Sequence, residues 1–155
     1  MNKVRIGVVG LGRLGFTHAE NIRFHTKNTN LVAVCSHSLE ELTKAREKLG
    51  VTNCFKSIKD MISGIKLDAV VLVSPSKHHA EQSSYCLQEG LHVFCEKPLA
   101  TTIEACKEVE KELIKRPFQV FMLGFMRRYD PSYLYAKKCI DAGKIGRPIL
   151  YRGYS

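Results

Sequence analysis

Three glycines with the spacing Gly10-x-Gly12-x-x-Gly15 follow an apolar run, Val4–Gly10, close to the first residue of the sequence. In this pattern the first glycine permits a tight turn from strand to helix, and the second lets a pyrophosphate approach the backbone. The third lets the helix pack close to the strand. The free N–H groups at the helix start, aided by the helix dipole, attract an anion. The spacing therefore predicts a dinucleotide site rather than a simple turn.

Polar side chains follow the second apolar run, Leu31–Cys35. Ser36 and His37 occupy the place where many dinucleotide-binding folds carry an acid for the ribose 2′-OH. Here no acid comes before Glu40. The hydroxyls and the imidazole could bind a ribose hydroxyl or a 2′-phosphate, so these residues leave the choice between NAD and NADP open. Ser38 could also serve as the N-cap of the next helix.

A further polar group follows the run Ala69–Val73, where Ser74 and Pro75 precede a helix that carries His78 and His79. His79 could reach the nicotinamide side of a cleft or merely cap the helix. Adjacent helical side chains do not face one another, so the two histidines do not suggest a metal site. With no third ligand apparent, we predict no metal.

Glu96, Lys97 and Pro98 follow the run Leu91–Cys95. Proline disfavours helical geometry at the residue before it, so Lys97 is expected to be extended at the strand end. A lysine in such a cleft can orient or deprotonate a hydroxyl or polarise a carbonyl, and we predict a functional role for it. Arg127 follows the next apolar run and could bind substrate hydroxyls or the cofactor.

These residues depend on elements that alternate along the chain. Strands are predicted over Val4–Gly10, Leu31–Cys35, Cys54–Phe55, Ala69–Val73, Leu91–Cys95 and Gln119–Gly124. Helices are predicted over Arg13–Phe24, Leu39–Leu49, Ile58–Ser63, Lys77–Glu89, 101–116 and Asp130–Ala142. The alternation predicts an α/β fold with a doubly wound parallel sheet and right-handed crossovers. Ligands bind such sheets beyond the carboxyl ends of the strands, which is where the candidate residues fall.

The fifth predicted helix shows a capping box, Thr101-x-x-Glu104, at its start. Its apolar residues recur at helical spacing and should share one buried face. They are Ile103, Cys106, Val109 and Leu113.

Composition favours a cytoplasmic protein with a substantial core. The 155 residues are 45% hydrophobic, and no apolar run approaches the roughly 18 residues of a membrane span. The first residues lack a small-x-small cleavage site, which argues against a signal peptide. The six cysteines show no C-x-x-C spacing, so reduced, buried thiols are expected rather than disulfides or zinc.

The formal net charge is +9, with basic clusters at 111–116 and 137–152. Such clusters can be solvated helix faces or can attract an anionic partner. Zinc-finger spacing and aromatic-interleaved basic strands are both absent, so we predict no nucleic-acid partner. An anionic nucleotide cofactor would account for part of the positive charge.

Four motifs in register bring a family into view. They are GLGRLG at 10–15, SPSKHHAEQ at 74–82, CEKPLA at 95–100 and GFMRRYDPSY at 124–133. Together they resemble the Gfo/Idh/MocA oxidoreductases, and among these most of all the inositol dehydrogenases. The resemblance implies a Rossmann NAD(P)-binding fold and an enzyme that oxidises a secondary hydroxyl of inositol or a related sugar or polyol by hydride transfer. It favours NAD, with NADP possible.

The resemblance also assigns roles to residues. The family's pyrophosphate loop falls on residues 10–15, its catalytic lysine on Lys97 and its strand-end arginine on Arg127, so Lys97 and Arg127 are the expected substrate-binding residues. With the strand-end residues, the predicted cofactor-binding set is Gly10, Gly12, Arg13, Leu14, Gly15, Ser36, His37, Ser74, Pro75, His79, Glu96 and Lys97.

The resemblance predicts a dinucleotide-binding domain over 1–125, followed over 126–155 by the connecting helix and the first strand, at 148–155, of a truncated substrate domain. The family's Asp-x-x-x-His general-base motif does not occur in this sequence. A non-catalytic nucleotide-binding or partner-binding module is therefore the alternative reading. An apolar edge at 149–154 would invite pairing with another chain, so a homo-oligomer is expected.

Overall fold

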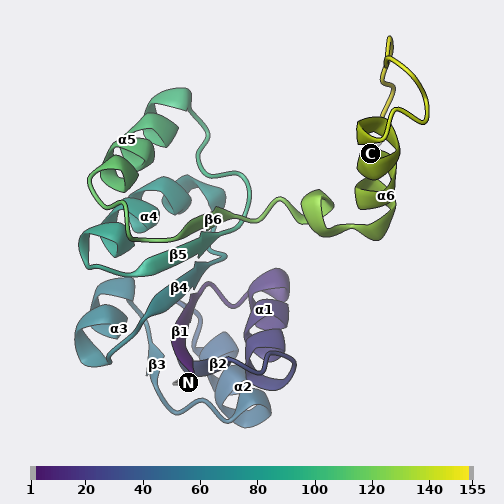
Figure 1. The fold of residues 1–155 in the computed structure, drawn as a ribbon. Coiled ribbons are helices and arrows are strands. Elements are labelled where there is room, and N and C mark those ends of the chain that lie inside the picture. Colours follow the sequence, from purple (N-terminus) through teal and green to yellow (C-terminus); the bar gives the residue numbers. More distant parts are fainter. Residues whose placement is uncertain (1–2, 154–155) are drawn as a thin grey trace. The chain divides into compact units, whose positions relative to one another are not determined.

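The computed structural model describes residues 3–153, which contain one six-stranded sheet with the order β3-β2-β1-β4-β5-β6 (Figure 1). All neighbouring strands pair in parallel. The strands are β1 (Val4–Val9), β2 (Thr29–Cys35), β3 (Cys54–Phe55), β4 (Ala69–Leu72), β5 (His92–Cys95) and β6 (Phe121–Leu123). The predicted doubly wound parallel sheet is confirmed.

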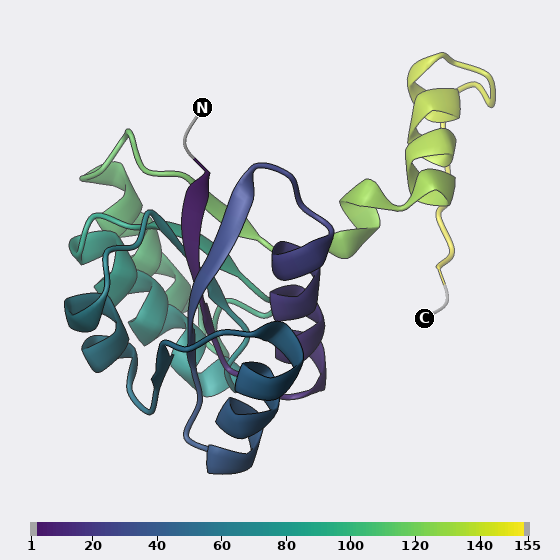
Figure 2. The ribbon, with the colours of Figure 1, turned by 90° about the horizontal axis from the view of Figure 1, so that it is seen from below.

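Helices connect the strands and cover both faces of the sheet (Figures 1 and 2). The α-helices are α1 (Arg13–Phe24), α2 (Leu39–Leu49), α3 (Ile58–Gly64), α4 (His79–Gln88), α5 (Ile103–Ile114) and α6 (Pro131–Asp141). Two short 3₁₀ helices are η1 (Ser76–His78) and η2 (Met126–Tyr129). Helices α1 and α2 lie on one face, and α3, α4 and α5 lie on the other.

The two faces have separate cores because neighbouring strand residues point to opposite sides. Val8 packs with the residues of α1 and α2, whereas Val9 packs with those of α3, α4 and α5. The same alternation separates Val71 from Val70 and Leu72 on β4. Strands buried on both faces explain the unbroken apolar runs in the sequence.

The strand order reverses between β1 and β4, since the chain proceeds outward from β1 to β3 and then returns to add β4 on the other side. In doubly wound sheets a crevice opens at this point beyond the carboxyl ends of the strands. The topology therefore brings the segments after β1, β2 and β4 to one place.

Helix α5 has its N-cap one residue later than the predicted capping box. Its N-cap is Thr102, whose hydroxyl accepts a hydrogen bond from the backbone N–H of Ala105 at 3.3 Å. The predicted cap, Thr101, lies one residue earlier. Val109 is buried as expected, but Ile103 is 69% exposed, because it lies in the first turn of the helix outside the packed face.

The described chain divides between Gly124 and Phe125 into two compact units. The first holds the whole sheet and α1–α5, and the second holds η2 and α6. In residues 3–153 no helix is long and apolar enough to cross a membrane.

The strand expected at 148–155 is not formed in its described part. Residues 148–153 have no regular secondary structure, and residues 154 and 155 lie outside the described residues. Ile149, Leu150 and Tyr151 are 97%, 86% and 80% exposed. The assignment of this segment to the first strand of a second domain stays a prediction.

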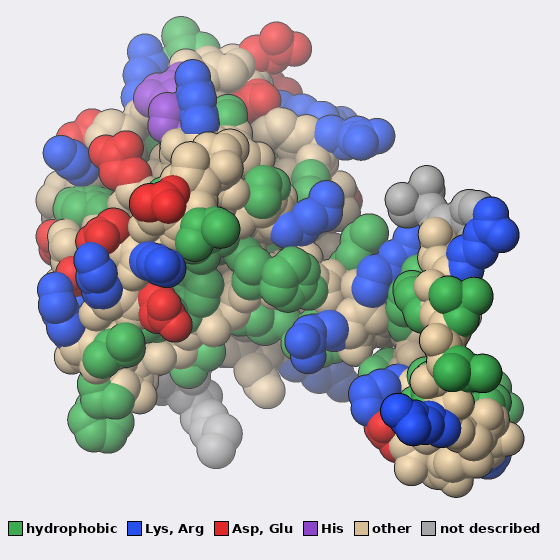
Figure 3. Space-filling model, turned by 90° about the horizontal axis from the view of Figure 1, so that it is seen from above, with side chains coloured by type: hydrophobic (Ala, Val, Ile, Leu, Met, Phe, Trp, Pro, Cys, Tyr) green, Lys and Arg blue, Asp and Glu red, His purple; other side chains and the backbone are tan. Residues whose placement is uncertain are grey.

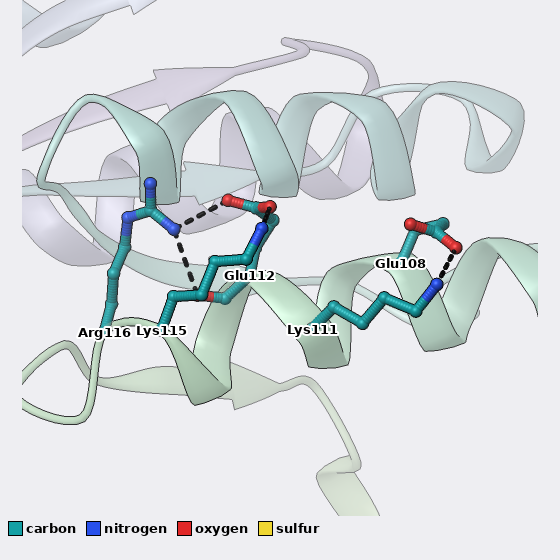
Figure 4. A network of polar contacts seen from close by, with 5 residues as sticks. All are labelled: Glu108, Lys111, Glu112, Lys115 and Arg116. Atoms are coloured by element: carbon teal, nitrogen blue, oxygen red, sulfur yellow. Dashed lines mark hydrogen bonds and ion pairs between the residues drawn. The ribbon is translucent and has the colours of Figure 1, made fainter.

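Basic residues of the 111–116 cluster pair with acids on the same helix (Figure 4). Lys111 forms an ion pair with Glu108, and Lys115 and Arg116 both form ion pairs with Glu112, with N···O distances of 2.6–2.7 Å. The hydrogen bond from Lys115 lowers the pKa of the Glu112 carboxyl. On the face in Figure 3, basic and acidic side chains of the first unit are intermingled. This part of the positive charge is a solvated helix face.

Candidate dinucleotide site

A pocket of about 810 Å³ lies at the carboxyl ends of β1, β2 and β4, where the strand order reverses. Nine of the predicted cofactor-binding residues line it: Gly10, Gly12, Arg13, Leu14, Gly15, Ser36, His37, Ser74 and Pro75. Segments that are far apart in sequence thus form one concave surface, as expected from a ligand site at the switch point. His79, Glu96 and Lys97 do not line this pocket.

The glycine turn (residues 10–15) is built as its spacing predicts. Gly10 has φ +89°, and a Cβ there would lie 2.6 Å from the carbonyl oxygen of Val73, so no other residue fits. A Cβ at Gly15 would lie 1.9 Å from the carbonyl oxygen of Gly10. These two positions hold α1 against the end of β1. A Cβ at Gly12 would meet nothing within 4 Å, so this backbone is open to the pocket.

The start of α1 is suited to an anion. Gly12 is the N-cap and supplies no side-chain cap, and the first turn carries no acidic residue. The N–H groups of the first turn have no intrahelical acceptors, and the helix dipole adds positive potential there. Arg13 lines the pocket beside them. These features fit a pyrophosphate.

At the end of β2 the structure reveals a residue that the sequence reasoning missed. Glu41 lines the pocket, and its Oε2 accepts a 2.5 Å hydrogen bond from the hydroxyl of Ser36. Ser38 caps α2 by accepting from the backbone N–H of Glu41 at 3.3 Å. The Ser38-x-x-Glu41 spacing of a capping box is the signal that could have drawn attention to Glu41.

At the end of β4, Ser74 donates a 2.5 Å hydrogen bond to Oε1 of Gln82, and both residues line the pocket. The start of α3 adds its N-cap Ser57 and Lys59 to the wall of the pocket. Gln82, Ser57 and Lys59 were not predicted as site residues.

The lysine loop (residues 95–98) is held by a half-buried carboxylate, that of Glu96. The side chain of Glu96 is 13% exposed, its Oε1 lies 3.0 Å from Nε2 of His18 on α1, and its Oε2 accepts from the N–H of Lys97 at 3.2 Å. A Cβ at Gly124 would come within 3.1 Å of this carboxylate. The structure therefore places Glu96 in the support of the loop, which differs from the predicted cofactor contact.

His79 is also held inside the protein. It is 2% exposed, its Nδ1 lies 2.7 Å from the carbonyl oxygen of Pro98, and its Nε2 lies 2.6 Å from that of Ser74. Both ring nitrogens therefore lie at backbone carbonyls inside the protein, and the predicted contact of His79 with a cofactor stays a prediction. The His79 ring ties the end of β4 to the lysine loop.

Lys97 is exposed, and its peptide bond to Pro98 is cis. His79 is buried and Glu96 is half-buried, whereas Lys97 is exposed. Lys97 is therefore the charged side chain that this loop presents to solvent. Its predicted contacts with cofactor and substrate remain predictions.

Arg127 lies in the second unit, on η2. Its Nη1 donates to Oδ2 of Asp130 at 3.1 Å, and its guanidinium lies 5.0 Å from the ring centroid of Tyr133. These local contacts orient Arg127, and its role in substrate binding also remains a prediction. Within residues 3–153 no group of three His, Cys, Asp or Glu residues is placed to hold a metal ion.

Comparison with known proteins places this geometry among oxidoreductases. The profile of the Gfo/Idh/MocA oxidoreductase family, described as having an NAD-binding Rossmann fold, matches residues 4–125. An inositol 2-dehydrogenase of Rubrobacter xylanophilus is 35% identical over 152 residues, which cover 98% of this chain and 44% of the relative.

Two solved structures are similar over most of the chain. A myo-inositol 2-dehydrogenase from Lactobacillus plantarum has a TM-score of 0.92 and 41% identity, over 94% of this chain and 43% of that protein. A scyllo-inositol dehydrogenase from Lactobacillus casei, solved with NAD(H) and scyllo-inositol, has a TM-score of 0.91 and 43% identity over the same shares. This chain therefore spans less than half the length of the relatives that it matches.

Proposed function

Because the chain belongs to the Gfo/Idh/MocA oxidoreductase family, we propose that its pocket binds NAD(H) and that the protein acts as a polyol dehydrogenase. The observation that carries this proposal is the glycine turn, which presents open backbone at Gly12 and an uncapped helix start to a pocket at the switch point. The bound NAD(H) in the L. casei relative supports the choice of ligand.

The pocket residues fit a dinucleotide in order along its length. The N–H groups of residues 12–15 would hold the pyrophosphate, and the segment after β2 would hold a ribose. Ser74 and Pro75, after β4, would line the side toward the nicotinamide. The lysine loop follows β5, next to β4 in the sheet, on that same side.

The proposed substrate is inositol or a related polyol or sugar, as the names of the relatives suggest. When bound, NAD supplies the acceptor for a hydride from the carbon that carries the hydroxyl. Lys97 would stabilise the alkoxide that develops on that hydroxyl, because an ammonium group held in place lowers the energy of a forming anion. Arg127 would bind further hydroxyls of the substrate.

A second candidate function is a nucleotide-binding module without catalytic activity. The sequence favours it in one respect, since no Asp is followed four residues later by a His that could form the family's general base. General acid–base help is worth about 10²–10⁴ in rate. We therefore expect these 155 residues alone to bind NADH and not to oxidise inositol.

Two further aspects belong to the proposal. The six free cysteines support a cytoplasmic location, because reducing compartments keep thiols free. The exposed apolar side chains at 149–151 support self-association as a homo-oligomer.

The test is a fluorescence titration of the 155-residue chain with NADH, with an inositol oxidation assay in parallel. Saturable binding without oxidation is expected. A second experiment joins this chain to the substrate domain of a relative. In that protein, Lys97→Ala should lower kcat about 10²–10⁴-fold and leave the NADH affinity within about twofold. Failure of NADH to bind the chain would overturn the proposal, and equal losses in kcat and affinity would make Lys97 a cofactor-binding residue.

A further inference from the structure

We propose that Glu41 selects NAD over NADP by accepting hydrogen bonds from the ribose hydroxyls and repelling a 2′-phosphate. This inference rests on the proposed function and adds a specificity residue to it. Folds of this kind place an acid directly after the second strand for the ribose. Here that position is Ser36, and the nearest carboxylate in the pocket comes from the first turn of α2.

Ser36 fixes the Glu41 carboxylate in the pocket. The Ser36 side chain is buried, and its hydroxyl donates to Oε2 of Glu41 at 2.5 Å. The Ser36 hydroxyl oxygen in turn accepts from the backbone N–H of Ser38 at 3.1 Å. The serine is thus fully used as a bridge between the strand end and the helix. A hydroxyl already committed to a carboxylate is a poor partner for a phosphate, whereas the carboxylate retains acceptor capacity for two hydroxyls.

Helix geometry explains why the acid is Glu41 and not its neighbour. In a capping box the residue three positions after the cap folds back toward the helix start. Glu41 occupies that position relative to Ser38, and its carboxylate meets Ser36 there. Glu40 is exposed and does not line the dinucleotide pocket. The two acids are adjacent in sequence, but of the two Glu41 alone lines the dinucleotide pocket.

Cations nearby set the competing expectation, and one of them, the exposed Lys59, lines the dinucleotide pocket itself. Arg13 and Lys44 line a hollow of about 560 Å³ that adjoins the glycine turn and also includes Glu40 and Glu41. Lys44 is exposed, and its Nζ lies 4.3 Å from the ring centroid of Phe16. Exposed cations are screened by solvent, while the half-buried, hydrogen-bonded Glu41 carboxylate is screened less. We therefore expect the carboxylate to decide the preference.

The experiment compares the dissociation constants of NADH and NADPH, measured by fluorescence with the 155-residue chain. The wild type should bind NADH at least about tenfold more tightly than NADPH. Glu41→Gln, which keeps the shape and removes the charge, should reduce that ratio at least about tenfold. Glu40→Gln is the matched control and should leave the ratio within about twofold. Thermal unfolding of each variant reports whether it is folded.

Each outcome has a distinct meaning. An unchanged ratio in folded Glu41→Gln, or a wild type that prefers NADPH, would overturn the role of Glu41. Lys44→Gln provides a second variant on an exposed side chain, and a large loss of NADPH affinity there would instead assign the choice to the cations. If wild type binds neither dinucleotide, the proposed function fails and not this inference alone.

Discussion

The glycine turn and the lysine loop follow strand ends at the same edge of the sheet, but they are built in opposite ways. The glycine turn exposes backbone, because side chains are missing at the places where they would collide or cover it. The lysine loop exposes the side chain of Lys97, while the buried His79 and the half-buried Glu96 are taken up by contacts that hold the loop. The glycine turn can be recognised from its own spacing, although the carbonyl of Val73, distant in sequence, also crowds Gly10. The lysine loop depends on contacts with residues distant in sequence.

The largest effect should come from closing the glycine turn. Gly15→Ala places a Cβ 1.9 Å from a backbone carbonyl oxygen, a contact that only movement of α1 can relieve. We expect a loss of roughly 3–5 kcal/mol in the free energy of unfolding, measured by urea denaturation. Gly12→Ala is the matched control and should cost less than about 1 kcal/mol. Similar losses in the two variants would mean that the turn is not packed as described.

Removing the support of the lysine loop should have the next largest effect. His79→Ala removes the imidazole that lies between the backbone carbonyls of Ser74 and Pro98, so a buried hydrogen bond is lost and a cavity opens. A cost of about 2–4 kcal/mol in the free energy of unfolding is expected. His78→Ala changes the preceding, half-buried histidine and should cost less than about 1 kcal/mol. If both variants lose the same stability, His79 does not hold the loop.

A smaller effect concerns the cysteines that end β2 and β5. Burial raises the pKa of the Cys35 thiol to about 11, with a contribution from Asp60, and burial likewise raises the pKa of Cys95 to about 11. In the unfolded chain these thiols ionise near pH 9.0. The folded state therefore keeps protons that the unfolded state loses, and this stability is present below pH 9 and lost as the pH rises toward 11.

Denaturation midpoints measured between pH 8 and 11 check this. The wild-type midpoint should fall as the pH rises above 9, and Cys35→Ala/Cys95→Ala should flatten that fall. Equal slopes for the two proteins would contradict the assignment to these thiols.

Elements with strong local patterns were predicted well from the sequence. The bounds of α1 and α2 match the prediction, because apolar periodicity and the flanking Gly12 and Ser38 define both starts. The short strand Cys54–Phe55 was also found. The apolar segment at 148–153 has no regular secondary structure, and its strand stays a prediction, since strand formation depends on a neighbour that no local pattern supplies.

Position at a strand end predicted which residues lie near the cleft, but not where their side chains point. The His79 ring turns inward because the carbonyl oxygen of Pro98, 19 residues later, lies at its Nδ1. The Glu96 carboxylate turns toward the ring of His18, which lies 78 residues earlier in the sequence. Glu41 was missed for a different reason, because its contact with Ser36 is local and the Ser38-x-x-Glu41 spacing of a capping box indicates it. The tertiary contacts of His79 and Glu96 decide side-chain direction and cannot be read from spacing.

The central claim is that the glycine turn holds a dinucleotide in the pocket at the switch point. Titrating NADH into the ¹⁵N-labelled 155-residue chain, with amide NMR spectra at each step, tests it most directly. The account predicts saturable shifts that are largest at residues 10–15 and at Ser36, with much smaller shifts along α5. Absence of shifts, or largest shifts at α5, would contradict it.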